Sequence, residues 1–253
     1  MVLAATRLPD RRGQRAGNRL SLPAAGKWMK PMARLTLVIG NKNYSSWSLR
    51  PWLLLKHLGL PFVEKRVDLT AADVKQQIRR YSPAGRVPVL IDGDNRVWES
   101  LAICEYLAER APAGAVWPET VEARALARAI ASEMHSGFAA LRTELPMDCR
   151  ARETGVAVSA AAESDIARVV EIWTDCRRRH QAAGPWLFGR FGAADAMFAP
   201  VALRFAAYGI RLPEPAAAYM ATVLADPALK AWVAAGQAEP ERAAWLERGA
   251  GHN

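Results

Sequence analysis

Three serines stand close together where an expected strand gives way to an expected helix. Ser45, Ser46 and Ser48 follow an apolar run over residues 35–39 and open an apolar-periodic stretch that runs to about Leu58. A helix N-terminus carries unpaired N–H groups and roughly half a positive charge. A hydroxyl held there can donate a hydrogen bond to an anion, and a thiolate is the anion that gains most from it. The segment therefore predicts a site that ionises a thiol.

Two further pieces follow this segment in the same half of the chain. Residues 85–90 read Gly-Arg-Val-Pro-Val-Leu, and residues 98–100 read Trp-Glu-Ser. The serines, the Val-Pro pair and the Glu-Ser pair occur in this order, each beside a predicted strand or helix end. The ends of strands and helices present unpaired backbone N–H and C=O groups to which a small ligand can hydrogen-bond.

The apolar pattern predicts two halves with different architecture. Residues 32–111 read as a βαβ-ββα, thioredoxin-like domain, an α/β unit, and residues 121–241 read as an all-helical (all-α) domain. Residues 112–120, with Pro and Gly, read as a linker, and residues 242–253 as a tail. The expected strands cover residues 35–39, 62–67, 88–91 and 96–98, and the expected helices cover residues 46–58, 71–79, 100–110, 121–145, 160–180, 194–208, 217–224 and 227–235.

The positive charge of the chain is concentrated at its N-terminus. The chain has 253 residues and a formal net charge of +9. Residues 1–31 hold seven Lys and Arg against one Asp, so the rest of the chain carries only +3. This distribution argues against a nucleic-acid-binding protein. We interpret residues 1–31 as a disordered basic leader or as a mis-assigned start before Met32, with a targeting segment or a binding arm for nucleic acid or a membrane surface as alternatives.

Cysteine usage and hydropathy point to a cytoplasmic protein. Cys104, Cys149 and Cys176 are scattered and form no CxxC, which argues against a secreted disulfide scaffold. No Cys and His residues have metal-ligand spacing. No apolar run approaches the roughly 20 residues that span a membrane. We therefore expect no metal, no nucleic-acid partner and no membrane partner.

The motifs, taken together, resemble the glutathione S-transferase superfamily, closest to its serine-type bacterial, zeta and tau-like branches. Two segments of the second half, residues 133–138 (Glu-Met-His-Ser-Gly-Phe) and residues 194–200 (Ala-Asp-Ala-Met-Phe-Ala-Pro), resemble one bacterial subgroup. The resemblance covers about residues 32–241. It implies glutathione as co-substrate, a small electrophile as second substrate and a two-fold homodimer.

The resemblance assigns the thiolate donor to the serine segment. Ser45 lies 14 residues before Gly59, which ends the helix, and the catalytic serine of related families lies at that separation. Ser46 and Ser48 are rivals for the same role. The alternative is that Ser45 or Ser46 is only an N-cap, worth about 1 kcal/mol to the helix.

The resemblance also assigns the residues that bind glutathione. Val87-Pro88 resembles a cis-proline turn, at which Val87 would pair its backbone with the cysteinyl unit. Ser100 would hold the γ-glutamyl carboxylate, with Glu99 near the ammonium group. Arg86 would pair with the glycine carboxylate. The alternatives are an ordinary turn proline, a simple helix cap and a solvated surface arginine.

The helical half is expected to supply the pocket for the second substrate. An amphipathic helix that faces its own core gives the same pattern of residues. We interpret His135 as a packed or capping residue, Arg50 as structural, and Asp195 as a fold determinant beside an N-cap at Gly192. The expected pocket residues are Met134, Phe138, Leu141 and Arg142.

The function that fits best is conjugation of glutathione to an electrophile, a detoxification reaction. A glutathione-dependent isomerase, dehalogenase or peroxidase would use the same site, and a non-catalytic binding module is a further alternative. Maleylacetoacetate isomerases carry a cysteine two residues after the catalytic serine, where this chain has Trp47. Ser45 and Ser48 stand where a thioredoxin carries CxxC, so dithiol exchange at that place is excluded.

Overall fold

A four-stranded sheet forms the first half of the protein. The computed structural model describes residues 35–243, so the interpretations of residues 1–31 and of most of the tail lie outside the described residues. The strands lie in the order β2-β1-β3-β4, with β1 parallel to β2 and antiparallel to β3. This is the expected thioredoxin-like topology. The strands are β1 (Leu35–Ile39), β2 (Phe62–Arg66), β3 (Val89–Asp92) and β4 (Asn95–Trp98).

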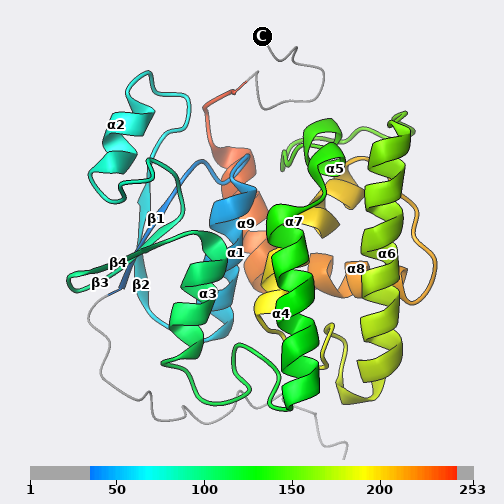
Figure 1. The fold of residues 1–253 in the computed structure, drawn as a ribbon. Coiled ribbons are helices and arrows are strands. Elements are labelled where there is room, and N and C mark those ends of the chain that lie inside the picture. The colour runs from blue at the N-terminus through cyan, green and yellow to red at the C-terminus, as the bar shows by residue number, and fades with distance from the viewer. Residues whose placement is uncertain (1–34, 244–253) are drawn as a thin grey trace, which may run out of the picture.

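The two faces of the sheet are covered by different helices. Leu37 of β1 belongs to the main core together with residues of α1 and α3, whereas Val38 packs with Ile78 of α2. Neighbouring residues of a strand point to opposite faces, so one strand serves both layers. Figure 1 shows α1 and α3 between the sheet and the helical half, with α2 beyond the sheet. These helices are α1 (Ser46–His57), α2 (Val74–Arg79) and α3 (Ser100–Ala108).

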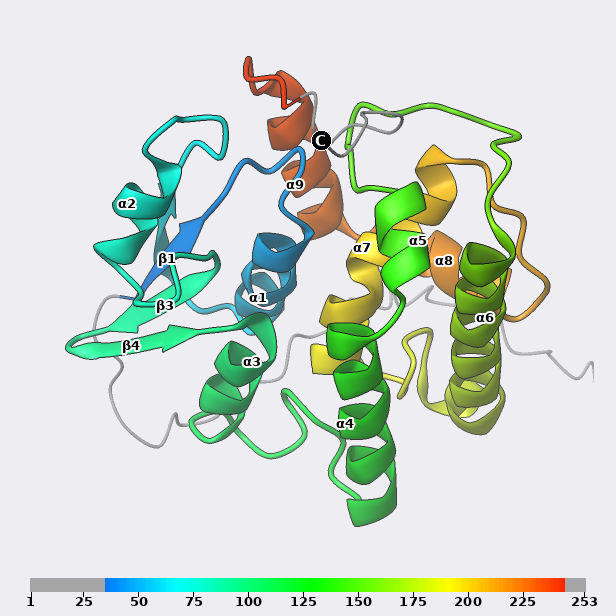
Figure 2. The same ribbon diagram turned by 45° about the horizontal axis from the view of Figure 1, so that its top comes forward.

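The second half is helical, as predicted, and α7 runs through its centre. The main core is continuous from Leu37 in the sheet to Trp173 and Phe198 in the helical half. In Figure 2, α9 and α7 stand next to α1, so the helical half meets the first half along α1. The elements are α4 (Val121–Ser136), α5 (Ala139–Glu144), α6 (Ala160–His180), a 3₁₀ turn (Gln181–Ala183), α7 (Ala193–Ala207), α8 (Ala216–Ala225) and α9 (Pro227–Ala238).

The single helix predicted over residues 121–145 is wrong, because the chain breaks between α4 and α5. Phe138 adopts a left-handed conformation with φ of 60°. The break leaves the last carbonyls of α4 without helical partners. The Arg142 guanidinium donates hydrogen bonds to two of them, Met134 O and His135 O. A side chain that satisfies helix-end carbonyls makes such a break tolerable.

Asp195 fixes the start of α7, as predicted. Its carboxylate accepts the Gly192 N–H at 2.9 Å, the Leu187 N–H at 3.0 Å and the Tyr219 hydroxyl at 3.1 Å. Glycine is required at the N-cap because a Cβ there would lie 2.8 Å from the Val116 carbonyl oxygen. The close approach of the linker therefore explains why no serine or threonine occupies this cap.

The helices of the described residues include none with the length and apolar character needed to cross a lipid bilayer.

Candidate functional site around the serine turn

Ser45 occupies the N-cap of α1. Its Oγ accepts the Ser48 N–H at 3.4 Å, and its own N–H donates to the Asn41 carbonyl at 2.8 Å. The side chain is nearly buried, with 6% of the residue exposed. Ser45 therefore caps α1, and its catalytic role stays a prediction. Capping is compatible with chemistry, because the cap hydroxyl lies where the free N–H groups of the first turn converge.

The other two serines support this turn from inside. Ser48 is fully buried, and its Oγ accepts the Gly40 N–H at 3.1 Å. The Ser45 hydroxyl donates a hydrogen bond to the Ser48 Oγ, 2.7 Å away. Ser46 is 8% exposed and its Oγ accepts from Arg204 at 3.4 Å. This burial disfavours Ser48 as a ligand contact and makes it a support for Ser45, while the catalytic assignment of each serine stays a prediction.

Three arginines surround the serine turn. Arg50 of α1 is 2% exposed, and its guanidinium lies 4.2 Å from the ring centroid of Trp47. The guanidinium of Arg142 lies 4.8 Å from the same ring. Arg204 of α7 donates to Ser46 and to the Arg142 and Leu145 carbonyls. Within residues 35–243, no carboxylate forms an ion pair with Arg50, Arg142 or Arg204.

The pKa values of these arginines reflect their crowding. Burial lowers the pKa of Arg50 well below its ordinary value, and the charges of Arg142 and Arg204 lower it further. Burial also lowers the pKa of Arg204, to about 10, which leaves its guanidinium charged at neutral pH. The repulsion among like charges means that an anion placed near them would be stabilised. The N-terminus of α1 adds to the same positive potential.

The Val-Pro and Glu-Ser motifs lie at the start of a strand and the start of a helix, as the sequence predicted. The Val87-Pro88 peptide bond is cis and leads directly into β3. Glu99 precedes α3 with φ of 70°, a conformation that a residue with a side chain adopts at a cost. Ser100 is the first residue of α3 and is buried. Strain of this kind is common at ligand sites.

Arg50 links the serine turn to the Glu-Ser motif. Its Nη1 donates to Ser100 Oγ at 3.5 Å, the limit of a hydrogen bond, and its stem belongs to the first turns of α1. The N-termini of α1 and α3 are thereby joined through one buried cation. Arg86 is exposed, and no contact described for residues 35–243 connects it to the serine turn. Its role in glutathione binding stays a prediction.

The residues predicted for the second-substrate pocket divide into two groups. Met134, Phe138 and Leu141 belong to the main core, which favours the packing alternative for them. Arg142 is only half-buried and faces Trp47. His135 makes an edge contact with the Trp47 ring at 5.2 Å, consistent with the packed role expected of it. Burial, with the charge of Arg50, lowers the pKa of His135.

Sequence reasoning missed Arg204, and it assigned Arg50 a structural role, which the burial of Arg50 and its contact with Ser100 support. Arg204 lies on the buried face of α7, four and seven residues from its partners in the apolar stripe, Pro200 and Met197. A charged residue at a core position of an amphipathic helix is the signal that could have found it. Arg50 carries a similar signal, because it stands among apolar residues of α1.

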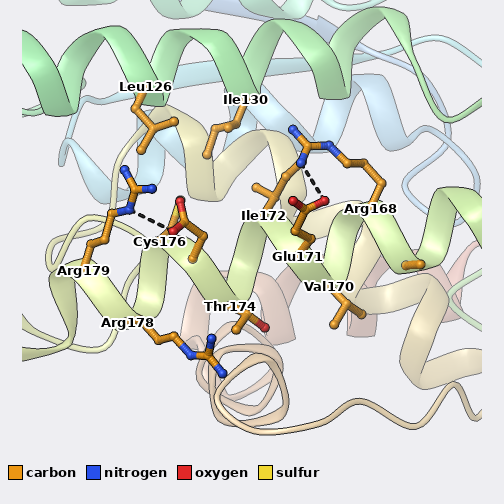
Figure 3. Close-up of a pocket in the computed structure, with 12 residues that line it drawn as sticks. Leu126, Ile130, Arg168, Val170, Glu171, Ile172, Thr174, Cys176, Arg178 and Arg179 are labelled. Atoms are coloured by element: carbon orange, nitrogen blue, oxygen red, sulfur yellow. Dashed lines mark hydrogen bonds and ion pairs between the residues drawn. The ribbon is translucent and has the colours of Figure 1, made fainter.

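A groove on the outer side of the helical half lies away from this site. It has a volume of about 520 Å³ and lies between α4 and α6. Figure 3 shows Leu126 and Ile130 of α4 facing a row of side chains on α6, with Arg168 and Arg179 paired to acidic residues of the same helix. The groove has no serine from the candidate site and belongs to a different face.

Among residues 35–243 there is no cluster of possible metal ligands and no disulfide. No group of His, Cys, Asp and Glu in residues 35–243 has an arrangement suited to a metal ion. The three cysteines are buried and unpaired with one another. Burial raises the pKa of each thiol to about 12.

Comparison with known proteins identifies the family. Residues 44–110, which contain the serine turn and both motifs, match the model of the glutathione S-transferase N-terminal domain. Glutathione S-transferase 3 of Zea mays is 33% identical over 192 residues, which cover 74% of this chain and 82% of the maize protein. The chain belongs to the glutathione S-transferase family.

Other relatives of this glutathione S-transferase family member differ in coverage. A glutathione transferase homologue from Burkholderia strain BGR1, solved with bound glutathione, superimposes with a TM-score of 0.61 at 26% identity, over 82% of this chain and 99% of that one. A probable maleylacetoacetate isomerase of Caenorhabditis elegans is 36% identical over 97 residues, which are 38% of this chain and 44% of the relative. The chain spans less than half the length of the first curated relatives it matches.

Proposed function

We propose that the protein is a glutathione transferase, which conjugates the glutathione thiolate to a small electrophile. On glutathione binding, the Ser45 hydroxyl turns from Ser48 Oγ to the thiolate, donates its hydrogen there and thereby lowers the pKa of the thiol. The observation that carries this proposal is the position of Ser45 at the N-terminus of α1, beside three arginines without carboxylate partners in residues 35–243. Each of these features favours an anion at one point.

The remaining glutathione contacts follow from the two motifs. The backbone of Val87, next to the cis bond to Pro88, pairs with the cysteinyl unit in the manner of an added strand. Ser100 at the start of α3 holds the γ-glutamyl carboxylate. The half-exposed carboxylate of Glu99, 3.7 Å from His135 Nε2, receives the ammonium group. Arg86, which is exposed, pairs with the glycine carboxylate.

A glutathione-dependent isomerase is the second candidate. The observation in its favour is the probable maleylacetoacetate isomerase among the relatives, which matches 38% of this chain. Trp47, packed between arginines, occupies the place of the isomerase cysteine and weighs against it. Dehalogenase and peroxidase activities would use the same bound thiolate, and a non-catalytic member would bind glutathione without turnover.

We propose further that the protein acts in the cytoplasm as a homodimer. Among residues 35–243, the exposed ring of Trp98 on β4 and the partly apolar groove between α4 and α6 are two surfaces that a second copy could cover. Light scattering during gel filtration tests this: a mass twice that of the 27.7 kDa chain supports the dimer, and a monomer refutes it.

The test of the activity is turnover of glutathione with a panel of electrophiles: an aryl halide, a dihalomethane, a hydroperoxide and a cis-enone acid. The first forms a thioether and reports the transferase, and the others report the alternatives. Ser45→Ala should lose turnover. Thr120→Ala is the matched control, because Thr120 caps α4 through the same kind of bond, to the Ala123 N–H, away from the site. Equal turnover in both variants would contradict the role of Ser45.

A further inference from the structure

Glu239, just after α9, binds the loop that leads to Ser45. Its two carboxylate oxygens accept the backbone N–H of Lys42 at 2.8 Å and of Asn43 at 3.1 Å. The Glu239 side chain is only 9% exposed, so water does not compete freely for these bonds. One carboxylate thus takes both N–H groups of two consecutive loop residues, an arrangement with charge-assisted hydrogen bonds.

The other backbone groups of these two residues are also held by distant segments. Trp232 of α9 donates its Nε1–H to the Lys42 carbonyl at 2.9 Å. The Cys149 N–H donates to the Asn43 carbonyl at 3.2 Å. With the two bonds to Glu239, every backbone N–H and C=O of Lys42 and Asn43 has a partner from the helical half. The conformation of the loop at Lys42 and Asn43 is therefore held by hydrogen bonds from the helical half.

The end of α9 also touches this loop backbone to backbone. A Cβ at Gly236 would lie 2.9 Å from the Asn43 nitrogen and 3.0 Å from the Lys42 carbonyl carbon. Only glycine permits this approach without displacing the loop. Figures 1 and 2 both show α9 alongside α1, and Figure 2 shows its end beside the loop that enters α1.

The constraint passes to Ser45 over a short stretch of chain. The N–H groups of Tyr44 and Ser45 both donate to the Asn41 carbonyl, at 3.2 and 2.8 Å. The loop from Asn41 to Ser45 is therefore one closed turn, and Glu239 accepts hydrogen bonds from the two residues at its centre. A shift of Lys42 and Asn43 would move the Ser45 hydroxyl relative to a bound thiol.

We propose that Glu239 is a positioning residue, which holds the loop of residues 41–44 so that the Ser45 hydroxyl meets the glutathione thiolate. This inference rests on the proposed function and adds to it a residue from the far end of the chain. Transition-state contacts are sensitive to small displacements, and a misplacement of about 1 Å can cost about 100-fold in rate.

Glu241 provides a matched control for the charge of Glu239. Both carboxylates face Arg66 of β2, Glu239 at 3.6 Å and Glu241 at 2.6 Å. No hydrogen bond described for residues 35–243 joins the Glu241 carboxylate to the backbone of the loop. Replacing Glu241 therefore removes the same charge and a shorter ion pair while the loop keeps both acceptors.

The experiment compares Glu239→Ala, Glu239→Gln and Glu241→Ala in the full chain. For each, thermal unfolding, glutathione binding, the pKa of the bound thiol and kcat are measured. We expect Glu239→Ala to raise the thiol pKa and to lower kcat by about tenfold to 100-fold. Glu239→Gln keeps one acceptor but places an amide donor against the other N–H, so its effect is intermediate. Glu241→Ala stays within about twofold of wild type, as a surface ion pair predicts.

The outcomes separate this inference from the proposed function. If wild type binds glutathione and ionises its thiol, but Glu239→Ala and Glu239→Gln do so with the same pKa and kcat, the positioning role is refuted alone. If Glu241→Ala has the same effect as Glu239→Ala, the charge matters and the loop contact does not, which also refutes it. If wild type neither binds glutathione nor lowers the pKa of its thiol, the proposed function itself fails.

Discussion

Replacing Arg50 with methionine should weaken glutathione binding strongly without unfolding the protein. Arg50 is almost completely buried, yet it forms no ion pair within the described part of the chain. Methionine has a similar length and leaves no unpaired carboxylate behind, so the usual penalty for breaking a buried ion pair is absent. The interaction that we expect to be lost is the one between the guanidinium and the anionic groups of glutathione.

The size of the effect follows from the contact between Arg50 and Ser100. Arg50 Nη1 lies 3.5 Å from Ser100 Oγ. A carboxylate oxygen that accepts from this hydroxyl would lie about 2.7 Å beyond it, which places the two charges about 6 Å apart. At an effective dielectric constant of about 20, their attraction is about 2–3 kcal/mol. That corresponds to a dissociation constant about 100-fold larger.

Calorimetric titration of glutathione into wild type, Arg50→Met and Arg50→Lys measures this directly. Arg50→Lys keeps the positive charge and should retain most of the affinity, which separates charge from packing. Thermal unfolding of each variant controls for structural damage. Binding to Arg50→Met within about threefold of wild type, less than 1 kcal/mol, would refute the electrostatic role of Arg50.

Two further predictions concern stability and thiol reactivity. Burial raises the pKa of Asp195 to about 6, against hydrogen bonds from Tyr219 and two backbone N–H groups that lower it. The folded protein then binds more protons than the unfolded chain between about pH 4 and pH 6, so the stabilising contribution of Asp195 is complete below its unfolded pKa and is lost as the pH rises through about 6. In urea unfolding across this range, the stability of wild type relative to Asp195→Asn should fall with rising pH by on the order of 2–3 kcal/mol; a rise would contradict the dominance of burial. Burial raises the pKa values of Cys104, Cys149 and Cys176 to about 12. An alkylating reagent at neutral pH should therefore label none of them in the native protein and all three in urea, and mass spectrometry can count the labels. Rapid labelling of the native protein would contradict this, because it would show an accessible thiolate.

Local sequence patterns predicted the elements and their order well. The strand at Leu35–Ile39 and the helix at Ala160–His180 begin and end where the apolar periodicity placed them. Asp195 could be assigned as a fold determinant because a capping box depends on spacing within a few residues. Such features are local, so the sequence alone contains them.

The break between α4 and α5 could not be predicted from the same periodicity. Residues on both sides of Phe138 keep their apolar face toward the core, and the break is made tolerable by Arg142, whose contacts depend on the tertiary structure. The hydrogen bond between Asn43 and Glu239 joins residues that are 196 positions apart in the sequence, so no local pattern predicts it. Long-range partners of a loop appear only when the chain is folded.

The three serines illustrate the limit for the site itself. Their position at a strand-to-helix turn was readable from sequence, but their ranking was not. The structure distinguishes Ser48 by its complete burial and Ser46 by its hydrogen bond from Arg204. Accessibility and hydrogen-bond partners decide which hydroxyl can meet a ligand, and both arise from packing.

The most direct test of the central claim is the pKa of the glutathione thiol bound to wild type and to Ser45→Ala, followed by thiolate absorbance against pH. We predict that wild type binds glutathione and that its thiol ionises near or below about pH 7, well under the free thiol. Ser45→Ala should bind glutathione but ionise it about one to two units higher, the equivalent of one charge-assisted hydrogen bond. An unchanged thiol pKa in Ser45→Ala, or no lowering of the thiol pKa in wild type, would contradict the account.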